Sequence, residues 1–231
     1  MDVSNKLRVD EILVRLKAMA DPSLLANEER LGIKTEGALG ISIWDLRKLA
    51  KEIGRDQALA EALWAAPVRE ARLLAGYLAD PAIISEATME HWVSAFDSWD
   101  LCDQVSDAFL FSPFAYQKAF EWSARSEEYV KRTAFVLMAG LAFYDKDATD
   151  EKLMEFFPII LREATDERNY VKKAVNWALR NIGKRNLRLN TEAIRLAEQI
   201  AAIDSPTARW IAKDALKELT SEKLRVRLNK K

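Results

Sequence analysis

Apolar positions recur at intervals of three and four residues along most of the chain, with charged residues between them. The first such stretch, residues 9–20, places its main apolar side chains on one helical face: Val9, Ile12, Leu13 and Leu16. A further helix is predicted to begin after Ser42, whose hydroxyl can cap it, and to end at Gly54. No stretch alternates with the period of a β-strand, so the pattern predicts an all-α protein.

The remaining helices are predicted from the same spacing and from the proline and glycine positions that interrupt it. Residues 26–42 hold three of the seven glycines and are expected to be irregular. Prolines 81, 113 and 206 fall between predicted helices, where they interrupt no helical hydrogen bond. The expected helices cover residues 57–64, 85–96, 114–125, 150–164 and 191–202.

Short similar segments then recur along the chain and predict a repeat architecture. Residues 130–134 read Val-Lys-Arg-Thr-Ala, and residues 171–174 read Val-Lys-Lys-Ala, with related segments at 68–71 and 207–212. Helical pairs whose similar segments recur along the chain, as those beginning at residues 130 and 171 do, are typical of a HEAT-like solenoid, in which each pair packs on the next. We therefore expect a single curved domain, with N-terminal helices at 1–66, repeats at 67–220 and a basic tail at 221–231.

The composition agrees with this fold and narrows the possible chemistry. Seven Gly and six Pro are few for 231 residues, which disfavours a turn-rich β protein. The single cysteine, Cys102, excludes an intrachain disulfide, and the single histidine, His91, leaves little for a metal site. We expect no metal and no cofactor. There is no apolar run of membrane-spanning length and no signal-peptide core, so we expect a cytoplasmic protein without a membrane partner.

Charge is balanced in total but not along the chain. The sequence has 35 Lys and Arg residues against 36 Asp and Glu. Residues 167–231 nevertheless hold 16 basic and 7 acidic residues, whereas residues 1–100 hold 12 and 17. This asymmetry favours a polyanionic partner for the C-terminal part.

The candidate chemistry begins with residues 98–103, Ser-Trp-Asp-Leu-Cys-Asp. In a helix, Trp99 and Asp103 lie one turn apart on the same face, which places an aromatic ring beside a carboxylate. Both groups attract a cation, so the pair suits a positively charged ligand. The competing interpretation is structural, because Trp is usually a core residue and Asp often caps a helix.

The repeat register extends this site. Alignment of the repeated segments places Asp103, Arg132 and Lys173 at equivalent positions, so they should form a row. Trp99 precedes Asp103 by one turn and Trp177 follows Lys173 by one turn, which directs both rings toward the same surface. The face beyond Trp177 carries further cations: Arg180, Lys184 and Arg185. Alternatively, these charges are solvated or pair between repeats.

Three segments in this order resemble the bacterial DNA alkylation repair family of HEAT-like-repeat DNA glycosylases. They are residues 98–103, residues 130–137 and residues 171–180, and the Gly-Ile-Ser of residues 40–42 also fits. The resemblance spans nearly the whole chain. It implies a C-shaped solenoid that holds duplex DNA and hydrolyses the N-glycosidic bond of positively charged N3- and N7-alkylated purines without flipping the base.

The resemblance also implies roles for individual residues. Trp99 and Trp177 match the tryptophans that contact the lesion, Asp103 matches the catalytic carboxylate, and Arg132 matches the essential arginine. We expect Arg132, Lys173, Arg180, Lys184 and Arg185 to form the basic DNA-binding face of a protein that acts as a monomer. The alternative from another class is a non-catalytic HEAT-repeat scaffold that binds DNA structures or a protein.

The chain also departs from the family pattern at its N-terminal end. Trp44 stands where relatives commonly have proline, and Ser42 stands where some carry glutamine. The tryptophans outside the site are expected to pack in the core or between helices: Trp44, Trp64, Trp92, Trp122 and Trp210. Cys102 points away from Asp103 on a helix and is expected to be a buried packing residue.

Overall fold

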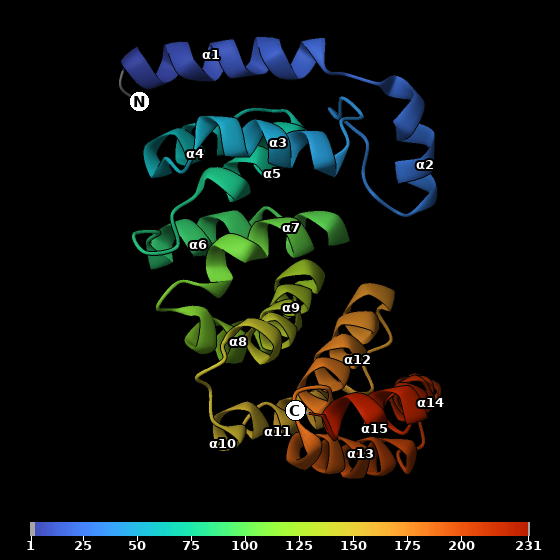
Figure 1. Cartoon of the computed structure of the whole chain (residues 1–231). Coiled ribbons are helices and arrows are strands. Elements are labelled where there is room, and N and C mark those ends of the chain that lie inside the picture. The colour runs from blue at the N-terminus through green and yellow to red at the C-terminus, as the bar shows by residue number, and fades with distance from the viewer. Residues whose placement is uncertain (1–2, 231) are drawn as a thin grey trace. The chain divides into compact units, whose positions relative to one another are not determined.

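The computed structural model describes residues 3–230, and all regular structure in that range is helical. The chain divides into two compact units, residues 1–114 and 115–231 (Figure 1). The first unit contains α1 (Val3–Ala18), η1 (Pro22–Leu24), α2 (Leu25–Arg30), α3 (Ile43–Ile53), α4 (Gln57–Trp64), α5 (Arg69–Leu78), α6 (Glu86–Ser94) and α7 (Trp99–Leu110). The second contains α8 (Ala115–Ser123), α9 (Glu128–Tyr144), α10 (Asp150–Met154), α11 (Phe157–Glu163), α12 (Asn169–Gly183), α13 (Leu187–Ala201), α14 (Pro206–Leu219) and α15 (Glu222–Leu228). The predicted all-α fold is confirmed.

Side-chain caps fix where several helices begin. The Ser42 hydroxyl accepts a hydrogen bond from the amide of Asp45 at 3.2 Å, and Gly54 follows α3 with a φ of 82°. Asp56 and Asn186 cap α4 and α13 in the same way, at 3.0 and 2.9 Å. Each such cap contributes about 1 kcal/mol. The predicted bounds of α3 and α4 are confirmed.

The core of the first unit is aromatic. The rings of Trp64 and Trp92 stack with centroids 4.6 Å apart, and Phe96 and Phe109 extend the cluster. Helix α5 packs against α3, α4 and α7. A Cβ added at Gly76 would lie 3.0 Å from the Cα of Val105, so glycine permits the close approach of α5 and α7. This contact sets the position of α7, which carries Trp99 and Asp103.

The second unit is built around α9 and α12, which pack against each other. Val130 and Val171, the opening residues of the two similar segments, are both buried. Helix α9 also packs on α8, and α12 on α13 and α14. The repeated segments therefore supply the interior helices of this unit.

Four predicted segments differ from the structure. Residues 150–164 form two helices, α10 and α11, because Pro158 lies in the first turn of α11 and cannot continue a helix from Met154. Helix α2 occupies part of the stretch that was expected to be irregular, and α13 begins at Leu187 because Asn186 caps it. The expected basic tail at 221–231 contains α15, whose Leu224 and Leu228 are buried.

Candidate functional site

Helix α7 positions the first two predicted site residues. Ser98 precedes it in extended conformation, and Trp99 and Asp103 follow one turn apart, both partly exposed. The indole Nε1–H of Trp99 donates to the backbone carbonyl of Leu31 at 3.0 Å. Leu31 is the residue that ends α2. A tertiary hydrogen bond therefore fixes the Trp99 ring beside the turn that carries Asp103.

A buried ionic cluster lies behind this turn. Arg69 of α5 is ion-paired with Asp100, the neighbour of Trp99, and both side chains are almost fully buried. The same guanidinium lies 3.5 Å from Glu28 of α2 and 3.7 Å from Glu70. Arg69 thus connects the first turn of α7 with the helix that leads to Leu31.

Glu70 extends the cluster to the Gly-Ile-Ser segment. Its Oε1 accepts hydrogen bonds from the amides of Leu39 and Gly40 at 2.9 Å and from Ile41 at 3.4 Å. Gly40 has a φ of 74°, and a Cβ there would meet the carbonyl oxygen of Asp21 at 2.2 Å, so this position requires glycine. The segment that carries part of the family resemblance is therefore held by a buried carboxylate.

Three carboxylates share this cluster with one guanidinium, and this excess of negative charge affects the pKa of Glu28. Burial raises the pKa of Glu28, nearby Arg69 lowers it in part, and the charges of Glu70 and Asp100 raise it further. Desolvation disfavours a carboxylate that is not fully compensated by a partner. Glu28 consequently gives up its charge more readily than an ordinary glutamate does.

Sequence reasoning missed this cluster. The only signal was the pair Arg69-Glu70, which stands at the start of a helix whose other residues, apart from Arg72 and Tyr77, are apolar. A charged pair that shares such a helix with Ala71, Leu73 and Leu74 has little solvent-facing surface available to it. The pairing with Asp100 and Glu28, from helices 31 and 41 residues away in sequence, could not be inferred from a local pattern.

Helix α3 presents an aromatic and cationic surface. Trp44 is 86% exposed, so its predicted packing role is wrong: Leu46, Leu49 and Ala50 occupy the buried side of α3 instead. Arg47 donates to Gln104 of α7 at 3.1 Å and lies over the ring of Tyr77. A shallow cavity of about 280 Å³ beside them is lined by three cations: Arg47, Lys51 and Arg55.

The predicted packing of the other tryptophans, in the core or between helices, is confirmed, with three in the core and Trp210 between α12 and α14. The side chains of Trp64, Trp92 and Trp122 are buried. Trp210 is 40% exposed, and the ammonium of Lys172 lies 5.0 Å from its ring centroid. Trp210 is exposed because Ala208, Ile211 and Ala212 already form the packed side of α14.

In the second unit, Arg132 is a buried residue of α9. Its Nη1 donates to the carbonyl oxygen of Tyr170, in the first turn of α12, at 2.8 Å. The adjacent Lys131 is ion-paired with Glu163 at 2.5 Å and Asp166 at 3.6 Å. Of the two neighbouring cations, Lys131 therefore serves packing between repeats, and Arg132 is held at the start of α12.

Helix α12 carries the predicted basic row. Lys173, Trp177, Arg180 and Lys184 are spaced so that they share one side of the helix. Lys173 is exposed and Trp177 partly exposed. Arg180 is ion-paired with Glu218 at 2.9 Å and lies 3.6 Å from Asp214, and Lys184 contacts Glu218 at 3.1 Å. Acidic residues of α14 thus neutralise part of this row.

Arg185 lies off this row and contacts the end of α9. It donates to the carbonyl oxygens of Ala142, Lys146 and Ala148 at 3.1, 2.9 and 3.1 Å. These bonds satisfy acceptors at and beyond the C-terminus of α9, where a cation is electrostatically favoured. Arg185 therefore has a structural task, in addition to the DNA contact predicted for it.

The four central residues fall in different units. Trp99 and Asp103 share α7 of the first unit, whereas Arg132 and Trp177 belong to α9 and α12 of the second. Each pair is held by contacts inside its own unit.

The lone cysteine and histidine take the places expected of them. Cys102 is buried, and its thiol donates to the carbonyl of Ser98 at 3.3 Å, which agrees with a packing role. His91 is exposed on α6. Within residues 3–230, no group of three or more His, Cys, Asp or Glu residues could hold a metal ion. In the same range, no helix is both long and apolar enough to cross a bilayer.

Comparison with known proteins gives one family match and several structural ones. The sequence profile of the family described as DNA alkylation repair enzyme matches residues 12–223. No curated protein matches the chain. A solved structure described as representing a new family of proteins related to the HEAT-like repeat DNA glycosylases, with affinity for branched DNA structures, superposes with a TM-score of 0.76. It is 20% identical and covers 91% of this chain and 95% of its own.

A second solved structure is AlkD2 from Streptococcus mutans, with a TM-score of 0.63 and 20% identity. That match covers 92% of this chain and 100% of AlkD2. At this identity the two structures establish the fold, which is the predicted HEAT-like helical repeat.

Proposed function

Because the chain belongs to the DNA alkylation repair enzyme family, we propose that it hydrolyses the N-glycosidic bond of N3- and N7-alkylated purines in duplex DNA. Membership in this family supports a role on DNA. The finer proposal rests on one observation: the ring of Trp99 is fixed by Leu31 one turn before the carboxylate of Asp103. An aromatic face and a carboxylate on neighbouring turns suit a ligand that carries positive charge.

The substrate class follows from what such a pair can stabilise. Alkylation at N3 or N7 gives the purine a full positive charge, which makes it a good leaving group. As the bond from C1′ to the base breaks, its electron pair passes to the purine, which leaves as a neutral alkylpurine. The deoxyribose becomes an oxocarbenium ion, and water adds to C1′ with loss of a proton. This reaction needs little acid catalysis but gains from a nearby negative charge.

In this proposal Asp103 stabilises the sugar cation and orients the attacking water. Trp99 contributes a ring face to the same cation, and Trp177 provides a second. A desolvated cation–π contact is worth about 0.5 to 2 kcal/mol, so each tryptophan contributes less than the carboxylate. Hydrolysis of this kind requires no lysine nucleophile, so we expect an abasic site without strand cleavage.

Arg132 is proposed to bind a backbone phosphate next to the lesion. Its hydrogen bond to the Tyr170 carbonyl occupies one guanidinium nitrogen and fixes the group at the start of α12. Arginine binds phosphate well because its planar donors match the phosphate oxygens. The proposal requires that Arg132 and Trp177 contact the same lesion as Trp99 and Asp103. It also has the lesion recognised without extrusion of the base from the duplex.

The remaining residues predicted to contact DNA differ in how readily they can bind a phosphate. Lys173 is exposed on the same side of α12 as Trp177 and suits a phosphate directly. Arg180 and Lys184 must exchange Glu218 for a phosphate, and Arg185 must retain its carbonyl contacts at α9. Affinity for DNA should fall steeply with salt, because phosphate contacts release counterions. We expect the protein to act as a monomer in the cytoplasm.

The direct test is release of N7-methylguanine from a duplex oligonucleotide under single-turnover conditions. Wild-type protein should release the base, and Asp103→Asn should bind the duplex with similar affinity while losing most of the rate. Asp97→Asn removes the same charge two residues before Trp99 and should retain the rate. Equal release by the Asp103 and Asp97 variants would remove Asp103 from the mechanism.

A second candidate function is non-catalytic binding of a DNA structure. The specific observation in its favour is the nearly complete exposure of Trp44 beside the cations of α3, which suits contact with unstacked bases. Under this alternative the wild-type protein would bind DNA and release no alkylpurine. The same single-turnover assay therefore separates the two functions.

A further inference from the structure

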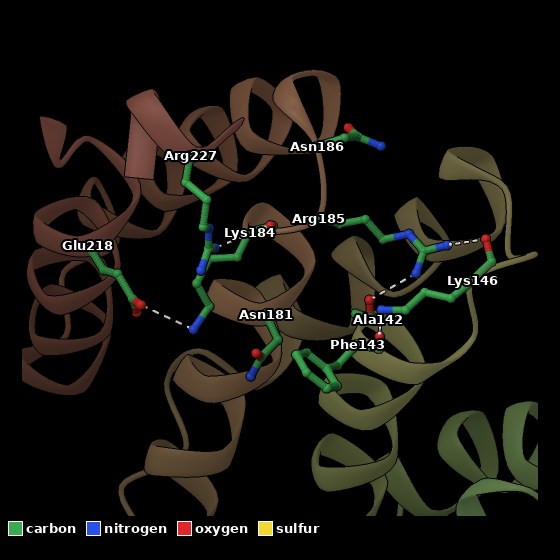
Figure 2. Close-up of a pocket in the computed structure, with 9 residues that line it drawn as sticks. All are labelled: Ala142, Phe143, Lys146, Asn181, Lys184, Arg185, Asn186, Glu218 and Arg227. Carbon is green, nitrogen blue, oxygen red and sulfur yellow. Dashed lines mark hydrogen bonds and ion pairs between the residues drawn. The ribbon is translucent and has the colours of Figure 1, made fainter. Parts of the chain in front are cut away.

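A polar cavity of about 440 Å³ lies within the second unit, at the C-terminal ends of α9 and α12 (Figure 2). None of Trp99, Asp103, Arg132 or Trp177 lines it. Figure 2 shows Lys184 and Arg227 on one side and Lys146 and Arg185 on the other, with Phe143 and Asn181 between them. The cavity therefore brings together side chains from α9, α12 and α15 that are distant in sequence.

The charge of this cavity is strongly positive. Its lining contains four cations, Lys146, Lys184, Arg185 and Arg227, against the single carboxylate of Glu218. Glu218 is shared between Lys184 and Arg180, so its negative charge is already divided. Arg185 satisfies helix-end carbonyls, and the ammonium of Lys146 donates to the carbonyl of Phe143, so the exposed guanidinium of Arg227 is the most accessible cation. Lys184 lies beside it, because Arg227 donates to the Lys184 carbonyl at 3.5 Å, and a phosphate would compete with Glu218 for the Lys184 ammonium. A phosphate is the anion that such a set of donors binds well.

The cavity also offers an aromatic face. Phe143 is 57% exposed at the end of α9, where its ring and that of Tyr144 form a T-shaped pair with centroids 4.7 Å apart. The ammonium of Lys146 lies 4.8 Å from its ring centroid, and Lys146 is itself exposed and long enough to move aside. An apolar ring in this position contributes nothing to binding of a bare anion. It suits a ligand that carries both a phosphate and a flat ring.

Asn181 adds a polar group next to the ring. Its Nδ2 donates to the carbonyl of Trp177 at 3.0 Å, which leaves the side-chain oxygen directed away from that bond. A side-chain carbonyl beside an aromatic face can accept a hydrogen bond from the edge of a nucleobase. The three features together match the parts of one nucleotide.

We propose that this cavity binds a nucleotide of single-stranded DNA, with the base stacked on Phe143 and its phosphate bound by Lys184 and Arg227. The proposal goes beyond alkylpurine excision and uses residues of the 115–231 unit alone. Stacking on an exposed ring and cationic contacts to the backbone are the two components of sequence-tolerant single-strand binding. A free mononucleotide carries the same chemistry, and competition by thymidine monophosphate separates the two sources.

Fluorescence anisotropy with a labelled oligothymidine of about ten residues tests the proposal. Phe143→Ala should weaken binding about tenfold, since loss of one stacked base has an effect of this order. Phe111→Ala is a matched control, because Phe111 is 56% exposed and lies outside the cavity. Its affinity should stay within about twofold of the wild type. Arg227→Gln should also weaken binding and reduce its dependence on salt.

Several outcomes would overturn the proposal. Unchanged oligothymidine affinity in Phe143→Ala, with an unchanged melting temperature, would exclude base stacking there. Competition by thymidine monophosphate at micromolar concentration would assign the cavity to a free nucleotide and not to a strand. Release of N7-methylguanine from duplex DNA should be retained by Phe143→Ala, so loss of the single-strand site and failure of the proposed glycosylase activity give different results.

Discussion

The guanidinium of Arg180 lies 2.9 Å from the carboxylate of Glu218, so a cation of the predicted DNA-binding row is already paired inside the protein. Lys184 shares the same carboxylate at 3.1 Å. Both contacts are partly exposed, and exposed ion pairs contribute little to stability. Their main consequence is for binding, since a phosphate must compete with Glu218 for these side chains.

Glu218→Gln should therefore strengthen binding to duplex DNA. The substitution keeps the shape of the side chain and removes the competing charge, and we expect affinity to rise about threefold to tenfold at low salt. Glu222→Gln is the control, because Glu222 pairs with Arg225 on α15 and outside the α12 row. If anisotropy shows the same rise in DNA affinity for both variants, the gain comes from the change in net charge and not from release of Arg180 and Lys184.

Arg69→Met should destabilise the first unit strongly. The substitution would leave Asp100, Glu70 and Glu28 without their shared cation, and removal of one partner from a buried ion pair costs about 3 to 5 kcal/mol. For a chain of this size that corresponds to a fall in Tm of about 10 °C. Arg55→Met, at an exposed arginine, should change Tm by no more than about 2 °C. Similar Tm values for both variants would show that the cluster is not structural.

The pH dependence of stability should report Glu28. Burial holds the pKa of folded Glu28 above its ordinary value, so its ionisation opposes folding. The contribution of Glu28 to the stability of the fold is most favourable below the pKa of Glu28 in the unfolded chain. It is lost as the pH rises through the pKa of Glu28 in the folded protein. Glu28→Gln should accordingly raise Tm at pH 7, and its advantage should shrink as the pH falls toward 4. An advantage that stays constant across this range, followed by circular dichroism, would contradict the assignment.

Trp44→Ala should separate binding from stability. A side chain that is 86% exposed contributes little to folding, so Tm should change by no more than about 2 °C. If α3 contacts DNA through this ring, affinity should fall about fivefold or more. Trp210→Ala provides the comparison on the second unit, and it should leave DNA affinity unchanged. Unaltered affinity in Trp44→Ala would remove α3 from the interface.

Helix periodicity and capping residues were sufficient to predict most of this fold. Ser42 and Gly54 mark the ends of α3 correctly because capping is a local property of the chain. The break between α10 and α11 could have been predicted from Pro158, which the apolar spacing of residues 150–164 conceals. The exposure of Trp44 could not have been predicted. Tryptophan is a largely apolar residue, and whether it lies on the buried or the exposed side of α3 depends on which side of α3 packs against α5.

The residue types of the candidate site could be predicted from the sequence, but the contacts that surround them could not. The expectation that Trp99 and Asp103 lie one turn apart required a helix over residues 98–103, and α7 supplies that helix from Trp99 onward. The hydrogen bond from Trp99 to Leu31 joins residues 68 apart in sequence, and no local pattern signals such a contact. The same applies to Glu218, which lies 38 residues beyond Arg180 and changes what that arginine can bind.

In the proposed mechanism Asp103 and Arg132, from different units, act on one lesion. A double-mutant cycle on the single-turnover release of N7-methylguanine tests it most directly, with Asp103→Asn, Arg132→Gln and the double variant. Glutamine can still donate to the Tyr170 carbonyl, which limits disturbance of α12. We predict release by the wild type and a double variant much less impaired than the product of the two single effects. No release by the wild type, or effects that simply multiply, would contradict the account.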